Sequence, residues 1–357
     1  MLSAMTRDVQ ALPKAHLHLH FTGSMRVETV RDLAERHGMR LPDALVGHWP
    51  PRLARATDER GWFRFQRLYD AARSCVRDEE DMRRIVREAA EDDADEGSRW
   101  LEIQVDPTSY APFVGGITPA LEIVLDEARE VSAQGRIGVG VVVAASRMRH
   151  PLEARTLARL AARYAGDEAG DVVGFGLSND ERRGSTPDFA HAFEIARRAG
   201  LALVPHGGEL LGAQAVMETL ESLSPDRIGH GVRCVEDPQV LDAVAEAGVT
   251  LEVCPGSNVA LGVYADPGDV PLRQIVEAGV RVALGADDPL LFGSRLAAQY
   301  AAARALGFDD AGLAGLARGS IEGSLAPERV RKQALDDVTA WLDTADRARD
   351  EPAVAPA

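Results

Sequence analysis

The stretch Leu12-Pro13-Lys14-Ala15-His16-Leu17-His18-Leu19-His20 opens the part of the chain that decides the fold. It is an apolar, extended run in which His18 and His20 stand two positions apart. Side chains alternate with period two along a strand, so both imidazoles are expected on one face. Neutral imidazole is the commonest metal ligand, and two of them supply half of a four-ligand site. The pattern indicates a first strand, Ala15–His20, that carries half of a metal site.

Further apolar, β-branched runs alternate with amphipathic helical patterns along the chain. Eight strands that are each followed by a helix predict a parallel sheet closed as a (β/α)8 TIM barrel. The run Val141-Val142-Val143 is typical of a strand buried on both faces. The seven later strands are expected at Trp100–Val105, Gly138–Ala144, Val172–Gly176, Leu201–His206, Arg227–Gly229, Thr250–Val253 and Arg281–Leu284. Helices are expected between them at Leu121–Gln134, Pro151–Tyr164, Phe189–Ala199, Gln214–Ser222 and Pro238–Ala247.

Two segments depart from this alternation. Residues 26–95 are expected to form a helical insertion after the first strand, and residues 305–348 to form extra C-terminal helices. The barrel itself is expected over residues 12–300, and the tail 351–357, rich in Pro and Ala, is expected to be disordered. The chain has no internal repeat, so residues 1–357 are predicted to form a single domain.

Composition excludes several classes of protein. A hydrophobic fraction of 45% is typical of a globular protein with a full core. No run approaches the roughly 20 apolar residues of a membrane span, and the N-terminus lacks a signal-peptide pattern, so we expect a cytoplasmic protein without membrane contact. A net charge of −16 argues against binding to nucleic acid. Three widely separated cysteines fit a reducing compartment. The oligomeric state is not indicated.

Strong polar motifs lie where the predicted strands end, which is the end at which barrels of this type form their active sites. His18, His20 and His206 would supply nitrogen ligands and Asp287 a carboxylate to one catalytic zinc ion, with a further position left for water. Such an ion lowers the pKa of its bound water towards about 7, which makes hydroxide available at neutral pH.

Two motifs next to this ligand set are expected to serve the reaction. His230, flanked by glycines, could orient the water without binding the metal. Glu209, three positions beyond a ligand, is placed to exchange protons with the substrate. Gly207 and Gly208 have no side chain to block the close approach of a flat ligand, so Gly208 is a candidate substrate contact.

Taken together, these motifs resemble the adenosine deaminase family of the amidohydrolase superfamily. The resemblance covers residues 12 to about 300, and the motifs run in the family's order. It rests on Pro13-Lys14-Ala15-His16-Leu17-His18-Leu19-His20, His206-Gly207-Gly208-Glu209, Ile228-Gly229-His230-Gly231, Cys254-Pro255-Gly256-Ser257-Asn258 and Asp287-Asp288-Pro289.

The resemblance implies hydrolytic deamination of an adenosine-type 6-aminopurine nucleoside to an inosine-type product and ammonia, by attack of metal-bound hydroxide on C6. It also implies one Zn²⁺ per chain, held by the four ligands named above. Glu209 is then implied to protonate purine N1, and His230 to hold and polarise the water. Asp288 is implied to contact N7, and the backbone N–H of Asn179 to contact N3.

One departure concerns the sugar. Where the family usually has Asp or Glu two residues after the second histidine, this chain has Thr22. In nucleoside-specific members that carboxylate accepts a hydrogen bond from the ribose 5′-hydroxyl, and a threonine hydroxyl is a weaker partner. We hypothesise relaxed selection at the 5′ position, with acceptance of 5′-substituted adenosines such as aminodeoxyfutalosine.

Other departures concern the walls of the pocket. Ser178-Asn179 stands in place of Ala-Gly, so an Asn side chain crowds the base pocket or adds a polar contact to it. His16 stands where Glu is common, and we expect it to face the same way as His18 and His20 without being a ligand. Trp62 and Phe65 fall in a segment that resembles the family's hydrophobic lid, but their spacing fits a core stripe equally well.

Three other functions are weighed against deamination of a nucleoside, and one feature of the sequence argues against each of them. Binuclear amidohydrolases bridge two metals with a carboxylated Lys on a middle strand, and this chain has no Lys between Lys14 and Lys332. Adenine deaminase shares the ligand set but typically keeps Glu at the position of Thr22. A non-catalytic purine-binding protein would need neither Glu209 nor His230.

Overall fold

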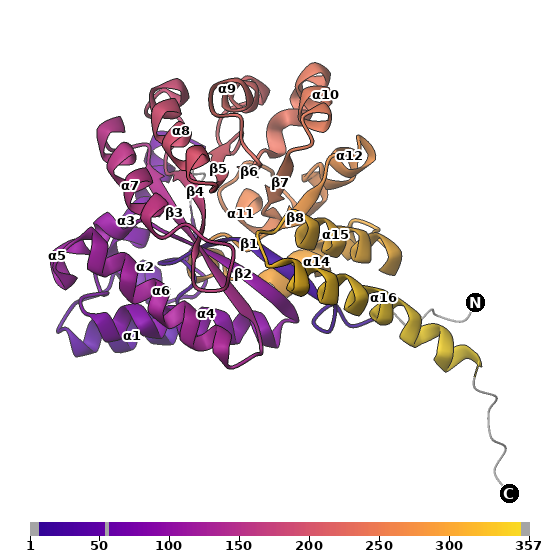
Figure 1. The fold of residues 1–357 in the computed structure, drawn as a ribbon, viewed down its shortest axis with the longest axis horizontal. Coiled ribbons are helices and arrows are strands. Elements are labelled where there is room, and N and C mark those ends of the chain that lie inside the picture. Colours follow the sequence, from indigo (N-terminus) through magenta and orange to yellow (C-terminus); the bar gives the residue numbers. More distant parts are fainter. Residues whose placement is uncertain (1–6, 54–56, 351–357) are drawn as a thin grey trace, which may run out of the picture.

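Eight parallel strands form the centre of the molecule, in the order β1 to β8 (Figure 1). The computed structural model describes residues 7–53 and 57–350. Backbone bonds join the segment after β8 to β1, because Asp287 N donates to His18 O and His20 N donates to Asp287 O, both at 3.0 Å. This arrangement confirms the predicted TIM barrel. The strands are β1 Lys14–His20, β2 Ser98–Val105, β3 Gly138–Ser146, β4 Val172–Ser178, β5 Ala202–Gly207, β6 Arg227–His230, β7 Thr250–Val253 and β8 Val282–Leu284.

Helices surround the strands (Figure 1). The expected insertion between β1 and β2 holds α1 Val27–Arg36, α2 Asp43–Val46, α3 Glu59–Arg73 and α4 Glu79–Asp95, and the chain ends with α15 Asp310–Glu322 and α16 Glu328–Asp350. None of the helices in the described ranges combines the length and the apolar character that crossing a bilayer requires. The expected tail, residues 351–357, lies outside the described residues. The remaining helices are α5 Ala111–Val114, α6 Ile117–Ala133, α7 Pro151–Arg163, α8 Ala190–Arg198, α9 Ala213–Leu223, α10 Pro238–Glu246, α11 Pro255–Ala260, α12 Leu272–Glu277, α13 Pro289–Phe292 and α14 Leu296–Ala305.

A buried network of charges lies inside the barrel. Arg227 on β6 donates from Nε to Glu252 Oε1 on β7 at 2.6 Å, and from Nη2 to Glu102 Oε2 on β2. Trp100 Nε1 on β2 donates to Glu102 Oε1 at 2.9 Å. Burying charges is costly unless each has a partner, and here both carboxylates have one. The network therefore ties β2, β6 and β7 together inside the barrel.

The expectation that His16 faces the same way as His18 and His20 is wrong. Its Nδ1 lies 2.8 Å from Asp93 Oδ2 on α4, and its Nε2 accepts a hydrogen bond from Ala286 N at 3.0 Å. The pairing of β1 with β2 shifts register between His16 and Leu19, and such an irregularity breaks the strict alternation of side chains. His16 therefore fastens β1 to α4 and to the segment after β8.

Candidate active site

A cavity of about 530 Å³ opens at the carboxyl ends of the strands. This volume falls in the range of about 300–1,000 Å³ that is typical of small-molecule sites. Its polar lining comes from the segments that end β1 to β6 and β8, while α3 contributes aromatic side chains. The lining residues used below are His20, Thr22, Trp62, Phe65, Gln104, Asn179, His206, Glu209, His230, Asp287 and Asp288.

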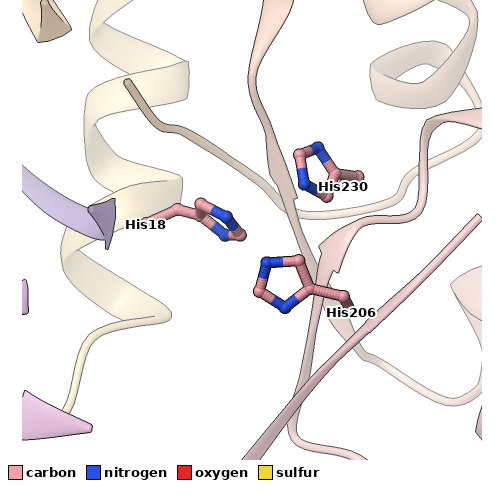
Figure 2. A group of neighbouring side chains, drawn as sticks. All are labelled: His18, His206 and His230. Atoms are coloured by element: carbon pink, nitrogen blue, oxygen red, sulfur yellow. The ribbon is translucent and has the colours of Figure 1, made fainter. Parts of the chain in front are cut away.

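The four expected metal ligands converge at one place. His20 Nε2 lies 3.2 Å from Asp287 Oδ1 and 3.3 Å from His206 Nε2, and His18 Nε2 lies 3.8 Å from the same Asp287 oxygen. Figure 2 shows the rings of His18, His206 and His230 turned towards one another, and these three offer nitrogen atoms within 4.8 Å of each other. The fold thus brings the two histidines near the start of the sequence close to His206 and Asp287, which lie much later in it.

The surroundings of His18 fit a zinc site. Its Nδ1 lies 2.7 Å from Glu252 Oε2, while its buried Nε2 has no hydrogen-bond partner among the described residues. A histidine that binds a metal commonly donates its other ring nitrogen to a carboxylate, which fixes its tautomer and orientation. Three imidazoles and one carboxylate are donors that zinc accepts. The residues present could therefore hold a zinc ion.

The backbone around the site is unusual. Asn179, His230 and Asp287 have φ values of 81°, 63° and 63°, a left-handed conformation that costs free energy for residues other than glycine. Each follows or ends a strand at the cavity. Strain of this kind concentrates at functional sites. Gly229 is required between two of the rings, since an added Cβ would lie 2.8 Å from His18 Cε1 and 3.1 Å from His206 Cγ.

Glu209 and His230 face each other beside the ligand set. Glu209 Oε1 lies 3.6 Å from His230 Nε2. Burial, together with the neighbouring Asp287 and Glu181 carboxylates, raises the pKa of Glu209 well above its usual range. Burial lowers the pKa of His230 to about 3, although Asp287 opposes this shift. The two shifts favour the protonated form of Glu209 and the neutral form of His230, compared with the same side chains in water.

The turn that carries Glu209 is held from behind by another carboxylate. Glu181 accepts backbone hydrogen bonds from Glu209 N at 3.1 Å and from Leu210 N and Leu211 N at 2.9 Å each, and it also accepts one from Gly208 N. A carboxylate that accepts several backbone N–H groups fixes the loop that donates them. The position of Glu209 therefore depends on Glu181.

The ligand set carries opposing electrostatic effects. Burial and the neighbouring rings of His18 and His20 lower the pKa of His206 well below its usual range. Burial also disfavours charge on His20, but Asp288 and Asp287 outweigh it and raise the pKa to about 9. The bond from His20, with the nearby imidazoles, lowers the pKa of Asp287 despite its burial. The Asp287 carboxylate is therefore ionised, as a metal ligand must be.

The other expected substrate contacts do not all line the cavity. Asp288 lies in the wall with its buried Oδ1 unpartnered among the described residues, and Asn179 lies there with its Oδ1 turned back onto Asp180 N at 2.8 Å. Thr22 Oγ1 is hydrogen-bonded to Tyr110 at 2.6 Å. Gly208 is not part of the lining: its φ is 68°, and an added Cβ would lie 2.3 Å from Val216 Cγ2. A turn and close packing explain this glycine.

Trp62 and Phe65 form an aromatic wall on α3. Both are buried and both line the cavity. Their ring centroids are 5.1 Å apart, and Phe65 stacks on Phe292 of α13 at 5.8 Å. The two residues thus contribute both to the wall of the cavity and to the apolar contact between the insertion and the barrel.

Several residues of the site were missed by sequence reasoning. Glu252, Glu181 and Gln104 support or line the cavity, and none belongs to a motif quoted above. A charged or amide residue inside an otherwise apolar strand is a usable signal, as in Thr250-Leu251-Glu252-Val253 on β7 and Glu102-Ile103-Gln104-Val105 on β2.

Comparisons with known proteins agree with this geometry. The family model described as adenosine deaminase matches residues 13–341. A putative adenosine/adenine deaminase of Streptomyces coelicolor is 64% identical over 94% of this chain and 98% of its own length. The crystal structure of an adenine deaminase from Arthrobacter aurescens is 30% identical, covers 93% of this chain and 100% of its own, and has a TM-score of 0.84.

A related amidohydrolase from Burkholderia ambifaria, solved with bound zinc, is 24% identical, covers 95% of this chain and 94% of its own, and has a TM-score of 0.81, which shows a shared fold. The family match spans nearly the whole chain and includes every strand of the barrel. These similarities therefore argue against the hypothesis of a non-catalytic purine-binding protein. The chain belongs to the adenosine/adenine deaminase family of the amidohydrolase superfamily and is a deaminase that acts on a purine.

Proposed function

We propose that this deaminase hydrolyses the 6-amino group of a purine nucleoside, converting an adenosine-type substrate and water into an inosine-type product and ammonia. One observation carries the proposal: three imidazoles and the Asp287 carboxylate meet beside Glu209 and His230 at the base of one cavity. The reaction needs ligands for a metal, a group that exchanges protons and a pocket for the base, and the site has all three.

The proposed resident cofactor is one zinc ion per chain, held by His18, His20, His206 and Asp287. The unpartnered Nε2 of His18, with Glu252 behind its other nitrogen, supports this assignment. When bound, zinc lowers the pKa of water towards about 7 and so supplies a nucleophile at neutral pH.

The chain's own residues orient the base and move protons. Glu209, buried near His230, would give a proton to purine N1, which makes C6 more electrophilic. His230 would hold the attacking water by a hydrogen bond from its ring. Asp288 would contact N7 and the backbone N–H of Asn179 would contact N3, which leaves C6 facing the ligand set. Water adds at C6, and the amino group leaves as ammonia after it receives a proton.

The extent of the cavity favours a nucleoside over the free base. Besides the residues of the ligand set, the lining of the cavity includes Thr22, Arg73 and Arg149. A sugar attached to N9 would occupy the part that these three residues line. Thr22 offers no charged acceptor to the 5′-hydroxyl, and its own hydroxyl is already bonded to Tyr110. We therefore extend the proposal to adenosines substituted at the 5′ position, of which aminodeoxyfutalosine is one.

Adenine itself is the second candidate substrate. The similarity to the adenine deaminase from Arthrobacter aurescens, which is 30% identical and matches this chain over 93% of its length, supports it. A carboxylate at the position of Thr22 is typical of adenine deaminases, so the threonine at this position argues against adenine as the substrate.

Ammonia release from zinc-loaded protein tests these alternatives. The panel is adenine, adenosine, 2′-deoxyadenosine and a 5′-substituted adenosine, with kcat/KM measured for each. We expect the nucleosides to exceed adenine by at least about tenfold, since only they fill the outer part of the cavity. A higher kcat/KM for adenine would establish the second candidate, and no ammonia from any of the four would reject the proposed function.

A further inference from the structure

Gln104 on β2 is a buried amide without a partner. Its side chain is 2% exposed and lines the cavity, yet neither Nε2 nor Oε1 has a hydrogen-bond partner among the described residues. Leaving a buried carboxamide unpaired costs free energy, because it loses its bonds to water and gains none in return. A ligand that enters the cavity is the natural source of the missing bonds.

Gln104 lies opposite the reacting groups. Arg227 on β6 reaches Glu102 on β2 through the barrel interior, so these two strands face each other. Side chains two apart on a strand share a face, and Gln104 therefore points inward, one layer nearer the cavity mouth than Glu102. His230 ends β6, and Glu209 lies just beyond β5. The amide thus faces this pair across the cavity.

This placement selects one edge of the purine, an argument that rests on the proposed function. With C6 at the ligand set, N1 at Glu209, N3 at Asn179 and N7 at Asp288, N9 and the group attached to it are left without a partner. Asn179 follows β4 and Asp288 follows β8, so N9 and its substituent face the strands that lie between these two in the barrel on the side away from Glu209, which are β1 to β3. Gln104 pairs in register with His20, and Thr22 lies two residues further along. Gln104 is therefore at the depth of the base and of the sugar hydroxyl nearest to it, whereas Thr22 is at the depth of the 5′ end.

A carboxamide suits a sugar hydroxyl, because it offers donors and an acceptor while a hydroxyl offers both as well. Two other polar side chains of the cavity already have partners: Thr22 Oγ1 is bonded to Tyr110 at 2.6 Å, and Gln66 Nε2 donates to Asp70 Oδ1 at 2.9 Å. We propose that Gln104 is a specificity-determining residue, and that its amide binds the ribose 2′-hydroxyl of the nucleoside and favours ribonucleosides over 2′-deoxyribonucleosides.

The test compares two substrates in two matched variants. Gln104→Met keeps the size of the side chain and removes its hydrogen bonds. We expect kcat/KM for adenosine to fall about 10-fold or more and that for 2′-deoxyadenosine to fall less than about 3-fold, so that the preference shrinks. Gln66→Met makes the same change at a cavity residue whose amide already has a partner, and it should leave the preference unaltered.

If Gln104 had only a structural role, its substitution would lower kcat/KM equally for adenosine and for 2′-deoxyadenosine. Equal losses in kcat/KM, or no loss, would therefore overturn the proposal. If Gln104→Met does not fold, Gln104→Glu replaces it. A carboxylate still accepts a hydrogen bond from the 2′-hydroxyl, so this variant should keep the preference, and loss of the preference in this variant would also overturn the proposal.

Binding of inosine and 2′-deoxyinosine to zinc-loaded protein, measured by calorimetry, gives a readout without turnover. If the wild-type protein binds inosine more tightly than 2′-deoxyinosine but releases no ammonia, the proposed function is rejected and the role of Gln104 is supported. Equal affinities for inosine and 2′-deoxyinosine would reject that role.

Discussion

On one side of the cavity, His18 and the turn that carries Glu209 are each held from behind by a buried carboxylate, Glu252 and Glu181 respectively. On the opposite wall, the amide of Gln104 has no partner among the described residues. Buried carboxylates in such positions fix geometry before substrate arrives. The reacting side is thus built to be rigid, whereas the sugar-facing wall leaves polar capacity for a ligand. Chemistry and substrate choice are therefore expected to respond to different residues.

The largest effect should come from the proton-transferring group on the reacting side. Glu209→Gln keeps the shape of the side chain but removes its titratable proton. We expect kcat to fall by about 10²–10⁴-fold, with zinc content and inosine affinity preserved. Steady-state kinetics, metal analysis and calorimetry measure the three quantities. Turnover close to that of the wild type would show that Glu209 does not transfer the proton.

Support from behind the ligands should show in metal affinity. Glu252→Gln weakens the charged bond to His18 Nδ1 and the ion pair with Arg227, so zinc affinity should fall about 10–100-fold. Competition with a chromogenic chelator measures it. Glu236→Gln removes a charge from an exposed pair with Arg233 and serves as the control, with no expected change. Equal zinc affinity in both variants would mean that His18 needs no such support.

The rings of His18 and His206 pack closely against Gly229, so a larger residue at this position should lower the stability of the protein. Gly229→Ala places a Cβ 2.8 Å from His18 Cε1, and overpacking of this kind costs about 1–3 kcal/mol in the free energy of unfolding. Gly315→Ala, in the middle of α15 with nothing within 4 Å, should instead stabilise by about 0.5–1 kcal/mol. Denaturant titration of the zinc-free proteins separates the two, and shifts of the same sign would contradict the packing at Gly229.

The smallest effect is expected on the sugar-facing side. Thr22→Asp supplies the carboxylate acceptor that this chain lacks, so the ratio of kcat/KM for adenosine to that for 5′-methylthioadenosine should rise about tenfold. Thr22→Val keeps the shape without the hydroxyl and should change the ratio less than about threefold. If Thr22→Asp leaves the ratio unchanged, selection at the 5′ position lies elsewhere in the cavity.

The fold was largely predictable because buried parallel strands are apolar runs that end in polar motifs. The eight strands were placed within a few residues of their observed ends, for example β7 at Thr250–Val253 and β4 extending to Ser178 instead of Gly176. The insertion and the C-terminal helices are also present, as α1 to α4 and as α15 and α16. Single-domain organisation stays a prediction.

The site was only partly predictable, for a physical reason. His18, His20, His206 and Asp287 lie in local motifs, and the structure brings them together, while their roles stay predictions until tested. Partners such as Glu252, 234 residues from His18, are invisible to any local pattern. The shift in register that turned His16 to Asp93 is a property of strand pairing, which alternation along a single strand does not reveal.

The most direct test of the account is zinc content measured together with ammonia release, before and after chelation. We predict one zinc ion per wild-type chain, loss of adenosine deamination when the ion is removed, and recovery when zinc is returned. His206→Ala and Asp287→Ala should each bind zinc far more weakly. Chelated protein that remains fully active, or variants that hold zinc as tightly as the wild type, would contradict the account.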